Sequence, residues 1–165
     1  MTGNRRSLLS LAAGLGLLGL PPLARSGAYE DFFSAIEVDN ESGLRQLLAR
    51  GMDPNTLDPR GQHGLFLALR GGSPKVFVLL MQHPDTTVDQ ANAVGETPLM
   101  MAALRGNLEA MKALIAKGAP VNRPGWTPLH YAASSPSAAA VSLLLELGAQ
   151  VDARAPNGNT PLMLA

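Results

Sequence analysis

Apolar and polar residues alternate along most of this chain with the spacing of short amphipathic helices. Four apolar ladders follow one pattern, in which an apolar residue is succeeded three and four positions later by an apolar pair: Leu44 with Leu47-Leu48, Phe77 with Leu80-Met81, Met111 with Leu114-Ile115, and Val141 with Leu144-Leu145. Residues at these spacings share one face of an α-helix. The pattern therefore predicts four helices, each with one buried face.

An alanine recurs at a nearly constant interval alongside these ladders. It stands at Ala35, Ala68, Ala102, Ala132 and Ala165, at steps of 33, 34, 30 and 33 residues, and a Gly-x-Thr-Pro-Leu phrase precedes each of the last three copies. A fixed period of roughly 33 residues indicates a stack of supersecondary units that contact mainly their neighbours. Such a stack presents an extended surface, so binding is a better first hypothesis than catalysis.

Turn and capping residues set the predicted helix boundaries within each unit. In the third unit Thr97 can cap a helix that Pro98 starts, and this helix runs through about Arg105 before Gly106 ends it. Asn107 can cap the second helix of the unit. The corresponding capping positions in the four units are Asn40, Ser73, Asn107 and Ser137, all good N-cap residues.

Residues 1–28 differ from the rest and have the three parts of a secretory signal peptide. Arg5-Arg6 gives a positive start, Leu8–Leu20 is almost wholly Leu, Ala and Gly, and Pro21-Pro22 interrupts any helix there before the small residues Ser26-Gly27-Ala28. The apolar run is shorter than the roughly 20 residues that span a bilayer. The alternative, a buried helix that caps the stack, fits poorly because glycines interrupt the run.

Arg5-Arg6 followed by Ser7-Leu8-Leu9 is also similar to a twin-arginine export motif. Ordinary secretory signals carry paired arginines too, so export through either route stays open. We expect a bacterial periplasmic or secreted protein, with no stable membrane span once the signal peptide has been removed.

Charge and cysteine content narrow the classes of function. The chain has 13 basic and 13 acidic residues and no cysteine; without Arg5, Arg6 and Arg25, 10 basic residues remain, a net charge of about −3. No basic stripe is present to neutralise phosphates, which disfavours nucleic acid as a partner. The lack of cysteine rules out disulfides, thiolate zinc sites and a cysteine nucleophile.

The repeated Gly-x-Thr-Pro-Leu phrase, the capping residues and the apolar ladders resemble the ankyrin repeat. Thr127-Pro128-Leu129-His130, Ala132-Ala133 and Gly148-Ala149 match its pattern nearly in full. The resemblance implies an all-α solenoid of stacked antiparallel helix pairs with projecting hairpin loops. It covers about residues 29–165, as repeats 29–57, 58–92, 93–122 and 123–155 and a truncated fifth at 156–165. The last stretch ends inside a first helix, and we interpret the chain as a fragment of a longer protein, the alternative being an end that frays or docks on a partner.

Four departures from the repeat pattern are visible. Repeat one has Glu30-Asp31-Phe32-Phe33 in place of the usual opening, which suits an N-terminal cap. Repeat two has His63-Gly64-Leu65 in place of Thr-Pro-Leu and one extra residue near His83-Pro84-Asp85. The 30-residue step shortens the loop at Val121–Gly125, and Pro136 replaces the glycine between the helices of repeat four. We expect specificity to lie in these irregularities.

Residues with catalytic or metal-binding potential are sparse. His63, His83 and His130 lie in three different repeats without a partner at ligand spacing. The resemblance gives His130 a structural role, in which its ring bonds between neighbouring loops. We therefore expect no catalytic residue, cofactor or metal.

The resemblance also predicts where a partner protein binds, on the loop fingers and first-helix faces. The candidates are Trp126, Tyr131, Arg105, Met101, Glu96, Arg123, Arg70 and Gln62. Trp, Tyr and Arg are enriched at interaction hot spots, so Trp126, Tyr131 and Arg105 are predicted to form the centre of the patch. The alternative for Met101 is packing between repeats.

The sequence thus predicts a non-catalytic protein–protein interaction scaffold that is exported and monomeric. A structural or regulatory module of a longer protein is the main alternative. An enzyme or small-molecule binder is a further one, and it would need a deep pocket with convergent polar groups.

Overall fold

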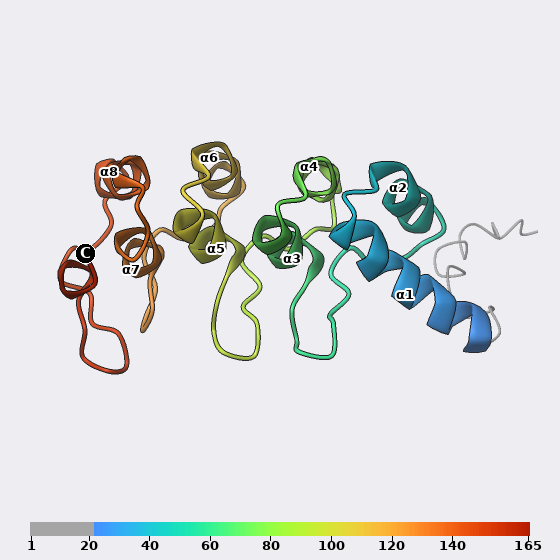
Figure 1. Cartoon of the computed structure of the whole chain (residues 1–165), viewed down its shortest axis with the longest axis horizontal. Coiled ribbons are helices and arrows are strands. Elements are labelled where there is room, and N and C mark those ends of the chain that lie inside the picture. Colours follow the sequence, from blue (N-terminus) through green and yellow to red (C-terminus); the bar gives the residue numbers. More distant parts are fainter. Residues whose placement is uncertain (1–21) are drawn as a thin grey trace, which may run out of the picture.

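The computed structural model describes residues 22–165, which form eight α-helices and one 3-10 helix. They are α1 Pro22–Glu37, α2 Glu41–Ala49, α3 Gly64–Gly71, α4 Pro74–Gln82, α5 Pro98–Leu104, α6 Leu108–Ala116, α7 Pro128–Ala133, α8 Ala138–Glu146 and η1 Pro161–Met163. Odd-numbered helices form one layer and even-numbered helices the other, with loops projecting past the odd-numbered layer (Figure 1). This arrangement is the predicted all-α solenoid.

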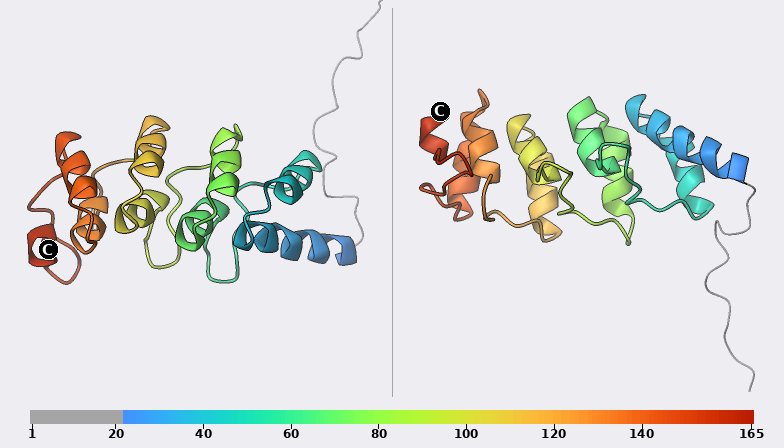
Figure 2. Two further views of the ribbon diagram at one scale, coloured as in Figure 1. Left: turned by 45° about the horizontal axis from the view of Figure 1, so that its top comes forward. Right: turned by 90° about the horizontal axis from the view of Figure 1, so that it is seen from below.

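The first four alanines of the ladder lie in the core between successive first helices. Ala35, Ala68, Ala102 and Ala132 are buried, and α1, α3, α5 and α7 pack on one another in sequence along the stack (Figure 2). A side chain as small as a methyl group lets adjacent helices approach closely. The apolar ladder residues Leu44, Phe77 and Met111 fill the space between the two layers and between repeats.

Helix α1 begins before the predicted start of the first repeat. Pro22 opens it at a position where a missing N–H costs nothing, and the helix continues through Ser26, Gly27 and Ala28 into Tyr29. Helix α1 therefore begins seven residues before residue 29, the predicted start of the first repeat. The predicted signal sequence up to residue 21, including the paired arginines and the apolar run, lies outside the described residues.

Side-chain caps confirm most of the predicted helix starts. The side-chain oxygens of Thr97, Asn40, Asn107 and Ser137 each accept a hydrogen bond from the backbone N–H three residues later. At Ser73 the prediction is wrong. Its hydroxyl donates instead to the carbonyl of Ile36 at 2.6 Å, a buried contact with the preceding repeat.

Asp39, from repeat one, supplies the missing cap of α4. Its carboxylate accepts a hydrogen bond of 3.0 Å from the N–H of Val76, the third helical residue. Asp39 has φ of +53°, a left-handed conformation that glycine adopts at the same turn in repeats two and three, at Gly72 and Gly106. The helix cap is thus exchanged between two repeats, which couples the end of α1 to the start of α4.

We predict that Asp39→Ala lowers the free energy of unfolding by about 1 to 2 kcal/mol, since it removes the cap and puts at positive φ a residue that tolerates this backbone less well than aspartate. Asp39→Asn should be close to the wild type because it keeps an acceptor oxygen and tolerates this backbone. Asp39→Gly should fall between them, losing the cap but relieving the backbone strain. Urea unfolding of the three variants measures this order, and an Ala variant as stable as Asn would contradict the exchanged cap.

The turn of repeat four is built differently, as the proline predicted. In repeats one, two and three the N–H of the second-helix cap bonds to a carbonyl of the first helix, for example Asn107 to Ala102 at 2.9 Å. In repeat four the N–H of Ser137 bonds to the hydroxyl of Ser135 at 3.2 Å. Because Pro136 cannot adopt positive φ, a side chain takes the place of the backbone acceptor.

The loop fingers also follow the predicted irregularity. Three of them close with a backbone hydrogen bond from an N–H to the carbonyl four residues later: Asp58 to Gln62, Asn92 to Glu96 and Ala155 to Asn159. The finger between α6 and α7 is visibly shorter than its neighbours (Figure 1). This shortened finger carries Trp126.

Candidate protein-binding surface

Trp126 lies at the base of the shortened finger, half-buried against the first helix of its own repeat. Its ring meets His130 edge-on with centroids 5.3 Å apart and Tyr131 edge-on at 6.4 Å. Edge-to-face pairs of this kind add about 0.5 to 1.5 kcal/mol each beyond the area that they bury. Trp126 is therefore held in place by α7 and still presents part of its ring to solvent.

Tyr131 connects this aromatic pair to the preceding finger. Its hydroxyl donates a hydrogen bond of 3.0 Å to a carboxylate oxygen of Glu96, whose other oxygen accepts from the side-chain amide of Asn92 at 2.8 Å. Burial, followed by the neighbouring Glu96 charge and the hydrogen bond to it, raises the pKa of the Tyr131 hydroxyl. The phenol thus stays protonated and acts as a fixed donor at neutral pH.

Arg105 belongs to a second network, along the ends of α3 and α5. Its guanidinium donates to the backbone carbonyl of Arg70, whose own guanidinium donates to the Gln62 side chain at 2.8 Å and lies 6.0 Å from the ring centre of Phe66. Arg105 is exposed, Arg70 is half-buried and Gln62 is buried. This network joins repeats two and three at the first-helix layer.

Arg123, in the shortened finger between α6 and α7, pairs with a residue of the finger before it, between α4 and α5. Its guanidinium lies 3.7 Å from the carboxylate of Asp89. Burial raises the pKa of the Asp89 carboxyl, and the positive charge of Arg123 partly opposes that rise. Arg123 therefore joins two successive fingers and also contributes to the surface.

The structure brings together part of the predicted patch. Trp126, Tyr131 and Glu96 form one connected group, whereas Arg105 contacts Arg70 in another. Met101 is buried in the core, as the packing alternative required, and the buried Gln62 acts as a support for Arg70. Sequence reasoning missed Asn92, which holds Glu96 in position; no motif distinguishes it from other loop residues.

A groove at the first two repeats was also missed from sequence. Residues of α1, α3 and the finger after α2 enclose about 510 Å³, with Tyr29, Phe33 and Leu67 offering apolar surface and Glu37, Arg60 and Arg70 offering charge. The Tyr29 hydroxyl donates to the carbonyl of Leu57 at 2.9 Å and so ties the finger to α1. Arg70 borders both this groove and the Arg105 network.

His130 and His63 hold successive fingers of the stack together by hydrogen bonds. His130 donates from Nε2 to the Asn159 carbonyl at 3.2 Å, and its Nδ1 contacts the N–H and hydroxyl of Thr127, so its ring links two successive fingers as predicted. His63 makes a similar link, from Nε2 to the Gln90 carbonyl at 2.8 Å, and does not cap α3. Within residues 22–165 no group of three or more His, Cys, Asp or Glu side chains is placed to hold a metal ion.

The buried His63 predicts a pH dependence of stability. Burial lowers the pKa of His63 below its usual 6.5, and the bond to Gln90 partly offsets this. The contribution of the neutral, buried His63 to the free energy of unfolding is therefore fully present above about pH 6.5. It is lost as the pH falls through the lowered pKa of the folded state. Thermal unfolding between about pH 7.5 and pH 5.5 should show a smaller decrease in Tm for His63→Gln than for the wild type. An equal decrease in Tm for His63→Gln and the wild type would contradict this assignment.

The patch has the chemistry of a recognition surface. The group around Trp126 combines a partly exposed indole with an oriented phenol, and the separate network of Arg105 and Arg70 carries two guanidinium groups. Trp, Tyr and Arg are the residue types enriched at interaction hot spots. None of the described helices is both long enough and apolar enough to cross a membrane.

Comparison with known proteins agrees with this architecture. A family model described as ankyrin repeats (3 copies) matches residues 32–124, 76–155 and 120–165. The chain is 35% identical over 129 residues to the nuclear factor NF-kappa-B p105 subunit of Gallus gallus, which covers 74% of this chain and 13% of that protein. It is 30% identical over 117 residues to the transient receptor potential cation channel subfamily A member 1 of Homo sapiens. That match covers 69% of this chain and 10% of the channel protein.

A third relative is the ankyrin repeat and SAM domain-containing protein 6 of Rattus norvegicus, 33% identical over 111 residues, covering 65% of this chain and 12% of that protein. The chain thus spans only a small part of each of these relatives. What they share with it is the repeat stack, and such stacks in general offer extended concave surfaces for binding. The family match, the buried alanine ladder and the paired helices together show that the chain belongs to the ankyrin-repeat family.

Proposed function

We propose that this protein is a non-catalytic scaffold that binds a partner protein through the finger side of repeats three and four. The observation that carries this proposal is the half-buried Trp126, fixed edge-on by His130 and Tyr131. A large side chain that is already ordered loses little conformational entropy on binding, so more of its contact energy contributes to affinity. Arg105, Arg70 and Arg123 supply charged groups along the same layer of first helices and fingers.

The framework around Trp126 supports recognition by preformed contacts. Tyr131 and Glu96 are joined at 3.0 Å, and Asn92 holds Glu96. Because these groups bond one another before a partner arrives, they form a rigid border around the indole. We expect a protein partner that buries Trp126 and leaves the Tyr131–Glu96 bond intact.

Hydroxyl-radical footprinting tests where the partner lies. The purified chain is labelled alone and together with an extract of the compartment in which it resides, and oxidation is read for Trp126, Tyr131 and Tyr29 by mass spectrometry. We expect the extract to protect Trp126, with Tyr29 in the groove of repeats one and two as the internal reference. Protection of Tyr29 with no change at Trp126 would instead assign binding to that groove.

We also propose that the protein is exported from a bacterial cytoplasm and processed after Ala28. Helix α1 has no acidic residue in its first turn when it begins at Pro22. A chain beginning at Tyr29 would have Glu30 and Asp31 in the first turn of the same helix, where acidic side chains favour the helix dipole. Export would place the scaffold in the periplasm or the medium.

The export proposal is tested by fractionation and N-terminal sequencing of the mature protein. A mature chain that starts at Tyr29 in the periplasm is expected, and an unprocessed cytoplasmic chain would contradict the proposal. Replacing the pair with Arg5→Lys and Arg6→Lys distinguishes the routes, because the twin-arginine route should stop while the general secretory route should continue.

A further inference from the structure

An asparagine clasps the loops that follow the second helices at two of the three junctions between repeats one to four. Asn122 donates from its side-chain amide to the carbonyl of Gly148 at 2.8 Å and accepts from the N–H of Gln150 at 2.9 Å. Asn55 makes the same two bonds to the loop after α4, at 2.7 and 2.8 Å. Each clasp ties one repeat to the next on the side of the second helices.

The junction of repeats two and three carries residues that do not form this clasp. Asp89 stands at the asparagine position, and Gly118 and Pro120 stand at the two partner positions. An ionised carboxylate only accepts hydrogen bonds, so Asp89 does not donate to the Gly118 carbonyl, and Pro120 has no N–H to donate. Asp89 instead faces Arg123 at 3.7 Å, which is longer than a hydrogen bond.

A cleft of about 560 Å³ separates the second helices at this same junction. Phe77 and Val78 of α4 line one side of it, and Ala110 and Ala113 of α6 line the other. Val78 is 50% exposed. Because these walls are largely apolar, bringing α4 and α6 together would remove further apolar surface from water. The cleft can therefore narrow without an unfavourable loss of polar hydration.

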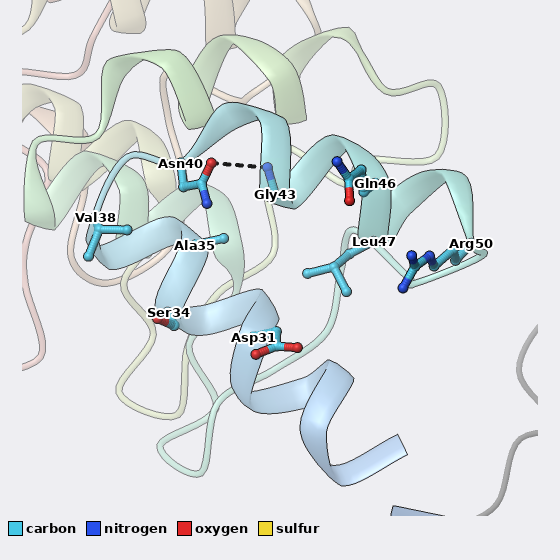
Figure 3. A pocket seen from close by; sticks show the side chains of 9 residues that line it. All are labelled: Asp31, Ser34, Ala35, Val38, Asn40, Gly43, Gln46, Leu47 and Arg50. Carbon is cyan, nitrogen blue, oxygen red and sulfur yellow. Dashed lines mark hydrogen bonds between the residues drawn. The ribbon is translucent and has the colours of Figure 1, made fainter. Parts of the chain in front are cut away.

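The pocket of repeat one has a different character. It encloses about 250 Å³ between α1 and α2 of a single repeat, and Asp31, Gln46 and Arg50 are among the residues that line it (Figure 3). It does not divide one repeat from the next. The junction of repeats one and two is closed by the bonds of Ser73 to Ile36 and of Asp39 to α4, in addition to its asparagine clasp.

The contacts that remain between repeats two and three lie on the side of the first helices. There α3 packs on α5, and Arg105 donates to the carbonyl of Arg70. Among the described residues, Thr86 Oγ1 and Arg123 Nη1 are the buried side-chain polar atoms without a hydrogen-bond partner, and both belong to loops that flank this junction. Buried polar atoms without partners make an arrangement less stable, so a departure from it costs less here.

We propose that the stack is hinged between repeats two and three. Repeats one and two form one body and repeats three and four the other, and the two bodies pivot about the contact of α3 with α5. The cleft between α4 and α6 widens and narrows as they move. Since the groove at Tyr29 lies on one body and Trp126 on the other, the hinge sets the distance between these two surfaces. The hinge does not depend on whether Trp126 binds a partner.

The test closes the hinge by installing the missing clasp. The double substitution Asp89→Asn with Pro120→Gln copies the clasp of Asn122. The chain has no cysteine, so Arg45→Cys in α2 and Ser142→Cys in α8, both at exposed positions, carry nitroxide labels on the two bodies. Double electron–electron resonance should give a broad distance distribution without the clasp and a narrow one with it. The Tm should rise by about 3 °C through the two added hydrogen bonds. Equal widths with and without the clasp would overturn the hinge.

The reverse exchange is the matched control. Asn122→Asp with Gln150→Pro removes the clasp between repeats three and four, where the bond of Tyr131 to Glu96 still joins the two repeats. It should lower the Tm but leave the width of the distance distribution as it was. A similar broadening in this variant would assign the width to the loops rather than to a hinge, and would overturn the proposal.

Native-state hydrogen exchange of the unsubstituted chain gives an independent readout. In a repeat stack, neighbouring repeats open together when their interface is strong and separately when it is weak. We expect the amides of α2 and α4 to share one opening free energy and those of α6 and α8 to share another. A single common value for all four helices would contradict the hinge.

Discussion

Trp126→Ala is expected to weaken partner binding about 30-fold, which corresponds to about 2 kcal/mol, the usual threshold for a hot-spot residue. The variant removes the exposed part of the indole and its edge contacts with His130 and Tyr131. The hydrogen bonds that hold α7, from His130 to Asn159 and from Tyr131 to Glu96, remain. Cooperative thermal unfolding should therefore persist, with a Tm lower by only a few degrees.

Isothermal titration calorimetry with the purified partner protein measures the loss of affinity in Trp126→Ala. Two further variants separate the loss of ring contact from the loss of rigidity around the indole. Trp126→Phe keeps a ring and should recover part of the affinity. Tyr131→Phe removes only the hydroxyl bonded to Glu96, so it should affect binding less than Trp126→Ala and reports on the rigidity of the border. Unchanged affinity in Trp126→Ala would show that the partner binds elsewhere.

Gly106→Ala is expected to be the most destabilising of the proposed substitutions, by about 3 kcal/mol. Gly106 has φ of +62°, and a Cβ there would lie 2.7 Å from the Cβ and 2.9 Å from the hydroxyl of Ser137 in the next repeat. Two costs combine, the strain of a left-handed alanine and an overlap that must separate α5 from the start of α8. The Tm should fall by roughly 10 °C.

Gly72→Ala is the matched control for the second cost. Gly72 occupies the same turn in repeat two with φ of +77°, and a Cβ there meets nothing within 4 Å. Gly72→Ala should lower the free energy of unfolding only by the strain of an alanine in the left-handed conformation, about 1 to 2 kcal/mol. Differential scanning calorimetry of both variants separates the backbone strain from the overlap with Ser137. An equal loss of stability in Gly106→Ala and Gly72→Ala would mean that repeats three and four move apart at little energetic cost.

Helix positions and caps could be read from the sequence because they depend on neighbours three or four residues apart. Asn40, Asn107 and Thr97 cap their own helices for this reason. The prediction failed at Ser73, where the hydroxyl finds Ile36 and Asp39 takes over the cap. Ile36 and Asp39 both lie in the preceding repeat. The spacing of residues within one repeat carries no information about which groups of the neighbouring repeat will come within hydrogen-bond distance.

The candidate site divides in the same way. Its residue types and their places in the repeat were predicted, and Trp126 and Tyr131 do contact each other, since they lie only five residues apart. Arg105 was grouped with them, yet it bonds to Arg70, and Tyr131 bonds to Glu96, each about one repeat away. The burial of Met101 and the support from Asn92 likewise depend on how adjacent repeats are packed.

The sequence by itself determined that this chain is a stack of helix pairs with a period of roughly 33 residues, one shortened finger and one altered turn. These properties follow from short-range patterns of apolar, capping and turn residues. Only the tertiary structure decided the contacts between repeats: the exchanged cap at Asp39, the bond from His63 to Gln90, and the two separate networks around Trp126 and Arg105. The physical reason is that a hydrogen bond or ring contact acts over a few ångströms, so partners some thirty residues apart are chosen by the packing of one repeat on the next.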